Sequence, residues 1–166
     1  MTPPEQPIGK DASAQALSEI RVMLRAGKRA EALELLRSAT ALIPEAADSA
    51  DALAYFARQL NEHVLSRRLY QHATALAPRE ARFWYNLATS ERALGDLAAA
   101  AAACDRALAL EPGMFPAVLL RSELSRATPA DNRVELLETM IRPIAGRAEA
   151  VPLLYALGKE RHELGE

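Results

Sequence analysis

The sequence predicts an all-α protein, a helical-repeat solenoid, because residues of several kinds recur every 34 positions. Three prolines mark this period: Pro44, Pro78 and Pro112. A turn column, a leucine column and a small-residue column share it: Gly27, Asn61 and Gly95; Leu42, Leu76 and Leu110; Ala39, Ala73 and Ala107. Four columns with one period indicate stacked copies of one helical unit.

The composition agrees with this fold class and excludes several functions. Half of the 166 residues are apolar and only 5% are aromatic, which suits closely packed helices better than strands. The net charge of -2 provides no general attraction to nucleic acid or to an anionic membrane. A single cysteine cannot form an intrachain disulfide, and neither a secretory signal nor a membrane span is visible. We therefore expect a soluble cytoplasmic protein with no nucleic-acid or membrane partner.

The N-terminal part should form a tail and then a first pair of helices. Residues 1–10 hold three prolines and few apolar side chains, so we expect them to be flexible. Asp11 or Ser13 can cap a helix that runs to about Ala26, and a second helix should occupy about 30–42. The proline that follows ends the unit, because it lacks an N–H donor and disfavours helix at the preceding residue.

The next two units are expected at about 47–80 and 81–114. In the second of these, Trp84, Leu87 and Ala88 are spaced by three and four residues and lie along one face of its first helix. Small side chains would let its two helices approach closely: Ala88, Ala100 and Ala107. We expect Trp84 to be a core residue and not an exposed binding residue.

The fourth unit, at about 115–150, departs from the pattern. Thr128-Pro129 stands where a turn glycine is expected, and Thr128 can cap a helix that begins at Pro129. A second helix should end at Pro143 and carry an apolar face: Val134, Leu136, Leu137, Met140 and Ile141. A final helix at about 151–166 is either a terminal cap or the first helix of a fifth repeat.

These features resemble the tetratricopeptide repeat family. The third unit carries the motif best, through residues at the family's spacings: Trp84, Leu87, Ala88, Gly95-Asp96, Ala100, Ala107 and Pro112. The resemblance implies one domain over residues 11–166, wound as a right-handed superhelix. It would hold about four helix pairs and a terminal helix, at about 13–46, 47–80, 81–114, 115–150 and 151–166.

The C-terminal part has a narrower resemblance. Residues 121–126, 128–132 and 155–160 are similar to bacterial proteins that join tetratricopeptide repeats to a sulfotransferase domain. In that family a catalytic domain using the sulfate donor 3'-phosphoadenylyl sulfate follows the repeats. This sequence has no glycine-rich phosphate-binding loop, so the resemblance implies a non-catalytic arm of such an enzyme.

The sequence predicts no catalytic residue, no cofactor site and no metal site. Cys104 falls among alanines on the core side of its helix, where a thiol is expected to be buried and unreactive. His63 and His72 are nine residues apart, which places them on opposite faces of one helix, and His162 is remote. We therefore expect that this chain is not an enzyme by itself.

The candidate binding surface is the concave side of the solenoid, which the first helix of each unit should line. Arg58, Arg92 and Arg126 recur every 34 residues and would form a row of guanidinium groups, with Arg25 nearby, suited to an acidic or extended peptide. The other candidates are Arg21, Tyr55, Gln59, Arg82, Tyr85, Asn86, Thr89 and Glu123. The alternative is that the row is solvated and paired with acidic neighbours: Glu62, Glu91 or Glu123.

Some tetratricopeptide domains hold the terminal carboxylate of a peptide with lysine and asparagine side chains. The corresponding positions here are Leu17, Arg21, Ala52, Arg82 and Asn86. Leu17 and Ala52 replace the lysine and one asparagine, which argues against recognition of that kind.

We predict that the chain is a protein–protein interaction scaffold whose groove binds a segment of another protein or of another domain of the same polypeptide. One alternative is the sulfotransferase arm. The other is self-association into a homo-oligomer through the last helix, where four leucines would lack a neighbour: Leu153, Leu154, Leu157 and Leu164.

Overall fold

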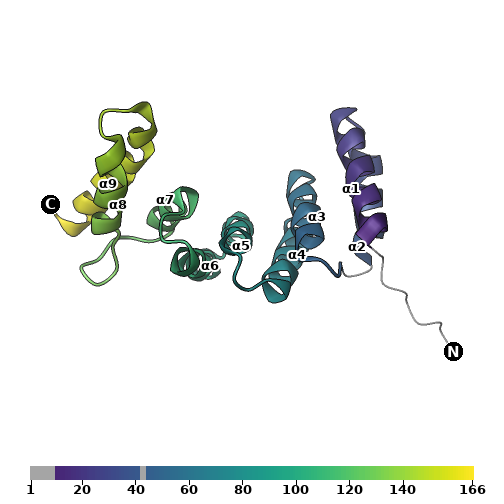
Figure 1. Ribbon diagram of the computed structural model, residues 1–166, viewed down its shortest axis with the longest axis horizontal. Helices are drawn as coiled ribbons and strands as arrows, with labels where there is room; N and C mark the ends of the chain where they lie inside the picture. Colours follow the sequence, from purple (N-terminus) through teal and green to yellow (C-terminus); the bar gives the residue numbers. More distant parts are fainter. Residues whose placement is uncertain (1–9, 42–43) are drawn as a thin grey trace.

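Antiparallel helix pairs follow one another in a row in the computed structural model, which describes residues 10–41 and 44–166 (Figure 1). Within these residues there are nine α-helices and no strand. The helices are α1 (Lys10–Arg25), α2 (Arg29–Ala41), α3 (Ala47–Gln59), α4 (His63–Leu76), α5 (Ala81–Leu94), α6 (Leu97–Leu110), α7 (Phe115–Leu124), α8 (Val134–Ile141) and α9 (Val151–Leu164). The predicted all-α solenoid is confirmed.

The row of pairs is bent into an arc. Figure 1 shows α5 and α6 low in the middle of the view and both ends of the row rising from them. Helices α1, α3, α5 and α7 lie on the inner side of this arc, and α2, α4 and α6 lie on its outer side. The first helix of each pair therefore lines the concave side.

The turn column has the backbone conformation that the period predicts. Gly27, Asn61 and Gly95 all have positive φ, at 76°, 66° and 83°, a region that glycine and asparagine enter most easily. After α5, the Gly95 and Asp96 N–H groups each donate at 3.0 Å to carbonyls of the last helical turn. Gly165 repeats this geometry after α9, with a φ of 83°.

Small side chains allow close packing within the pairs. Ala54, Ala88, Ala100 and Ala107 are completely buried, as predicted for the last three. Trp84 is only partly buried: it packs against the main core cluster, while its indole N–H donates to the Pro78 carbonyl at 3.0 Å. Trp84 thus contacts the core, as expected, but it is not fully buried.

The connection from α7 to α8 corrects the prediction for the fourth unit. No helix begins at Pro129; residues 128–131 form a tight turn instead, and α8 begins at Val134. The Thr128 hydroxyl accepts from the Asp131 N–H at 3.1 Å, so Thr128 caps this turn and not a helix. The turn places Asp131 and Arg133 against the neighbouring helices, where both side chains form ion pairs.

At the N-terminus, the first helix begins earlier than expected. Helix α1 begins at Lys10, so Asp11 and Ser13 lie within the helix and do not precede it as caps. The expected tail lies outside the described residues, apart from Lys10.

Helix α9 is fastened by a buried carboxylate. Glu160, only 1% exposed, accepts hydrogen bonds from the Ser122 hydroxyl at 2.6 Å and from the Arg133 N–H at 2.6 Å. The Arg133 guanidinium, from the loop before α8, lies 3.3 Å from the same carboxylate. Three segments of the chain, α7, the loop and α9, therefore share one acceptor.

A second buried charge extends this network toward α6. The Arg121 guanidinium, 7% exposed, pairs with Asp105 at 2.8 Å and with Asp131 at 3.0 Å. Hydrogen bonds from Arg133 and Arg121 to the Asp131 carboxylate hold its pKa below the usual value, against the opposite effect of partial burial. Residues of the three segments that resemble the sulfotransferase-linked repeats thus have structural roles here.

The last helix also corrects two residues of the self-association prediction. Leu153 is buried in a small core with Val118 and Leu137, and the partly buried Leu157 packs against the same core. Leu154, in contrast, is 49% exposed. Within the described residues, no helix combines the length and the apolar character that crossing a membrane requires.

Candidate functional site

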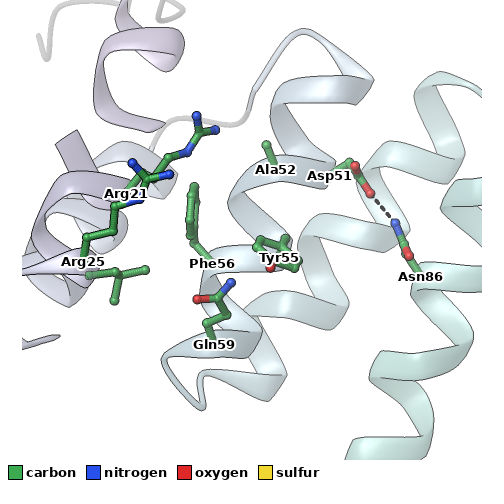
Figure 2. A pocket seen from close by; sticks show the side chains of 9 residues that line it. Arg21, Arg25, Asp51, Ala52, Tyr55, Phe56, Gln59 and Asn86 are labelled. Carbon is green, nitrogen blue, oxygen red and sulfur yellow. Dashed lines mark hydrogen bonds between the residues drawn. The ribbon is translucent and has the colours of Figure 1, made fainter. Parts of the chain in front are cut away.

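A hollow on the inner side of the arc, with a volume of about 570 Å³, is a candidate site that we call the first hollow. It is formed by α1, α3 and α5, and its lining residues are Arg21, Leu24, Arg25, Asp51, Ala52, Tyr55, Phe56, Gln59 and Asn86. Figure 2 shows Arg21 and Arg25 on one side, the α3 side chains in the middle and Asn86 on the far side. Five residues predicted from the sequence meet here: Arg21, Arg25, Tyr55, Gln59 and Asn86.

The centre of the first hollow is aromatic. Phe56 is buried in the main core, while the neighbouring Tyr55 is exposed and meets it edge-on, with 5.7 Å between ring centroids. Outside the lining residues, the Arg58 guanidinium lies 5.6 Å from the centroid of the Tyr55 ring. Because Ala52 has only a methyl side chain, the space above α3 stays open.

One wall of the first hollow carries two available cations. Arg21 and Arg25 are four residues apart, so both project from the same face of α1. Both are exposed, and neither forms an ion pair with the residues that the structure describes. The two guanidinium groups can therefore bind an anion without first giving up such a partner.

The opposite wall carries an ion-paired cluster in which one arginine faces two aspartates. The Asp51 carboxylate accepts from Arg82 at 2.5 Å and from the Asn86 amide at 2.6 Å, and Arg82 also reaches Asp48 at 2.8 Å. This cluster joins α3 to α5. Arg82 thus lies at the predicted surface, but its charge is used within the protein.

A middle hollow of about 290 Å³ follows between α5 and α7. It contains four more of the predicted residues, Tyr85, Thr89, Arg92 and Glu123, beside an apolar set: Phe115, Pro116, Leu119 and Leu120. The Arg92 guanidinium lies 3.0 Å from the Glu123 carboxylate. Arg92 is therefore paired with an acidic neighbour, which was the alternative to a free arginine row.

The predicted row of three arginines does not form one continuous array. Helix α7 ends at Leu124, so Arg126 lies in the loop and not on an inner helix as expected. Of the acidic neighbours considered, only Glu123 pairs with a member of the row; Glu62 pairs with Arg37 and Glu91 with Arg67.

A last hollow of about 270 Å³ lies between α7 and α9. Its lining residues are Leu119, Ser122, Glu123, Val151, Pro152, Tyr155, Ala156 and Lys159. Tyr155 is 80% exposed and Val151 62% exposed. This site was not predicted from the sequence, although Val151 and Tyr155 are four residues apart on an expected helix and would therefore lie on one of its faces.

Cys104 and the possible metal ligands of the described residues do not form a reactive group. Cys104 is completely buried, as predicted, and burial followed by the nearby charge of Asp105 raises the pKa of its thiol to about 12. Within residues 10–41 and 44–166, no three His, Cys, Asp or Glu side chains are grouped as metal ligands would be.

We therefore expect Cys104 to resist modification by a disulfide reagent in the folded protein. Because the thiolate is the reactive form, a pKa of about 12 makes reaction with a disulfide reagent at pH 8 roughly a thousandfold slower than for a free thiol. The measurement is the absorbance of the thiolate that the reagent releases. Protein unfolded in guanidinium is the fully reactive reference. Stoichiometric reaction within seconds under native conditions would contradict it.

Comparisons with known proteins agree with this architecture. The family model of the tetratricopeptide repeat matches residues 81–114, which is the third unit expected from the sequence. No curated protein matches the chain. Among solved structures, YrrB, described as a tetratricopeptide protein with an unusual peptide-binding site, has a TM-score of 0.65 and 18% identity, over 87% of this chain and 74% of its own.

Two further structures have the same fold at low identity. The first tetratricopeptide domain of Spaghetti (RPAP3), bound to the HSP90 peptide SRMEEVD, has a TM-score of 0.59 and 18% identity, over 70% of this chain and 93% of its own. MamA from Desulfovibrio magneticus RS-1 has a TM-score of 0.59 and 14% identity, over 92% of this chain and 78% of its own. The chain thus contains a tetratricopeptide repeat at residues 81–114 and has the α-solenoid fold of tetratricopeptide-repeat proteins.

Proposed function

We propose that this protein is an interaction scaffold that binds an extended, acidic segment of a partner protein along the inner side of its solenoid. The observation that carries the proposal is the first hollow, where Arg21 and Arg25 flank an open space of about 570 Å³. Two structural neighbours support a peptide partner: the RPAP3 domain is bound to a peptide that contains acidic residues, and YrrB is described as having a peptide-binding site.

The chemistry of the first hollow favours a carboxylate over other groups. A guanidinium presents planar, paired N–H donors that match a carboxylate. Because exposed ion pairs contribute only about 0.2–1 kcal/mol each, the cations alone do not hold a partner tightly. Tyr55 adds an exposed aromatic face beside them, and Gln59 adds an amide that can bond to an extended backbone.

The other predicted residues extend the proposed surface. Tyr85, Thr89, Arg92 and Glu123 lie in the middle hollow, where an acidic ligand would compete with Glu123 for Arg92. The row of Arg58, Arg92 and Arg126 remains a prediction, and the experiment below separates it from the pair on α1.

The test is fluorescence anisotropy with a labelled, C-terminally amidated peptide of central glutamates in a Gly-Ser context. Replacing Arg21 and Arg25 together by Ala is expected to weaken binding about tenfold at low salt, because two charge-assisted contacts are lost. The matched control is Arg79→Ala with Arg147→Ala, which removes the same charge from exposed positions outside the three hollows.

Three results decide between the proposals. Equal weakening by the α1 pair and by the control pair would show that only net charge matters, and the site would be rejected. Equal binding of a lysine peptide would reject an acidic partner. Loss of binding in the Arg58, Arg92 and Arg126 triple Ala variant, with the α1 pair neutral, would transfer the role to the predicted row.

The two alternative functions remain predictions. None of the comparisons reported above is with a sulfotransferase, and the residues of that resemblance are engaged in the network around Glu160 and Arg121. Self-association through α9 is still compatible with the exposure of Leu154, although no longer with a role for Leu153.

A further inference from the structure

We propose that the last hollow is a second subsite that takes a bulky apolar side chain of the same partner segment. This inference rests on the proposed function and makes it more specific. The groove then recognises an extended peptide that has acidic residues at one end and an aromatic or aliphatic residue at the other.

The lining of the last hollow is suited to an apolar side chain. Leu119 comes from α7, and Val151, Pro152, Tyr155 and Ala156 come from α9. Val151 and Tyr155 are 62% and 80% exposed, so two large apolar side chains lie next to an open hollow of about 270 Å³. Exposed aromatic groups beside a cavity are typical of residues that anchor a partner.

The three hollows follow one another along the inner side of the arc. The middle and last hollows share Leu119 and Glu123. The first hollow reaches Asn86 on α5, whose neighbour Tyr85 lines the middle hollow. One extended segment can therefore pass from α1 to α9 without leaving this surface.

The charges in the last hollow are already satisfied, which determines the chemistry of its occupant. Glu123 is paired with Arg92 at 3.0 Å. The Lys159 ammonium donates to the Ser122 carbonyl at 2.8 Å and to Glu163 at 2.9 Å. The free surface here is thus apolar, whereas the first hollow presents the available cations Arg21 and Arg25.

The spacing of the helices sets the length of the partner segment. Three steps between successive inner helices separate the middle of α1–α3 from the middle of α7–α9. At about 8–10 Å per packed helix, this is roughly 24–30 Å, or about eight extended residues at about 3.3 Å each. A peptide with a much shorter spacer cannot reach both subsites.

The experiment uses labelled peptides with three glutamates, a Gly-Ser spacer and a terminal Phe, made in both chain orders and compared with the same peptides carrying Gly instead of Phe. In the unmodified protein, one Phe peptide should bind about tenfold more tightly than its Gly partner when the spacer has about eight residues, but not with about two. Replacing Val151 and Tyr155 together by Ser should remove this advantage and leave the affinity of the Gly peptide unchanged.

The matched control is Leu154→Ser, which removes an exposed apolar side chain from the same helix but outside the last hollow, and should keep the Phe advantage.

Equal binding of Phe and Gly peptides in both orders, while Arg21→Ala with Arg25→Ala still weakens both, would overturn the subsite and leave the proposed function standing. Insensitivity of every peptide to the α1 pair would instead overturn the proposed function. A Phe advantage that survives the loss of Val151 and Tyr155 would place the apolar contact elsewhere. If the double Ser variant changes only the oligomeric state in sedimentation, the hollow is an interface between copies and the subsite is rejected.

Discussion

Replacing Glu160 by Ala is expected to destabilise the C-terminal helices by about 3–5 kcal/mol, the loss typical of removing one partner from a buried charge pair. Arg133, 7% exposed, would keep only Asp131 as an ion-pair partner, and the Ser122 hydroxyl and the Arg133 N–H would lose their acceptor. Urea unfolding followed by circular dichroism measures the loss. Hydrogen exchange should show faster opening in α8 and α9 while α3 to α6 stay protected, since stability in repeat proteins is carried mostly by neighbouring units.

An exposed pair between the same helices provides the matched control for Glu160. Glu138 on α8 pairs with Arg161 on α9, and both side chains are exposed. Glu138→Gln should therefore cost at most about 1 kcal/mol. If Glu160→Ala does not fold, Glu160→Gln keeps one acceptor and allows a smaller loss to be measured. Equal stability of the Glu160 and Glu138 variants would show that burial of the network contributes nothing.

Replacing Phe83 by Ala is expected to cost about 3–5 kcal/mol, because the ring is 1% exposed and its removal leaves a cavity. Phe83 packs with Ala50 and Ala73, so it joins the second helix pair to the third. The Asp51–Asn86 hydrogen bond crosses the same junction between α3 and α5. We therefore expect binding of the acidic peptide to weaken together with stability.

The control for Phe83 is the same substitution at a less buried site. Phe115→Ala, at the start of α7, removes a partly buried ring and should cost only about 1–2 kcal/mol. Thermal unfolding of both variants checks the order. A loss at Phe83 no larger than at Phe115 would contradict a tightly packed junction between the pairs.

Much of the fold could be predicted because it depends on local, repeated requirements. In the first three pairs, a residue with positive φ follows the first helix, and Gly27, Asn61 and Gly95 supply it at a fixed spacing. Helices that approach closely need small side chains, and Ala88, Ala100 and Ala107 supply them. Neither requirement depends on distant parts of the chain.

The fourth unit could not be predicted in the same way, because its requirements are not local. Thr128-Pro129 has the sequence signature of a helix start, yet the chain forms a turn there. Ion pairs with residues outside the turn accompany this conformation: Asp131 pairs with Arg121, and Arg133 pairs with Glu160. No local signal reports that a buried carboxylate on α9 will accept the Arg133 N–H.

The residues of the candidate site could be predicted from the sequence, but the ion pairs among them could not. By itself the sequence determined that the chain is a solenoid of helix pairs, that the first helix of each pair faces inward, and that Arg21, Arg25, Tyr55, Gln59 and Asn86 share that face. Only the tertiary structure decided which charges are free. Arg82 and Arg92 look as available as Arg21 in the sequence, but stacking brings Asp48, Asp51 and Glu123 from neighbouring helices against them. Which residues share one face of a helix depends only on their spacing in the sequence, so the residues of the groove could be predicted. Which charged side chains form ion pairs depends on how successive helix pairs stack, so the free charges of the groove could not be predicted.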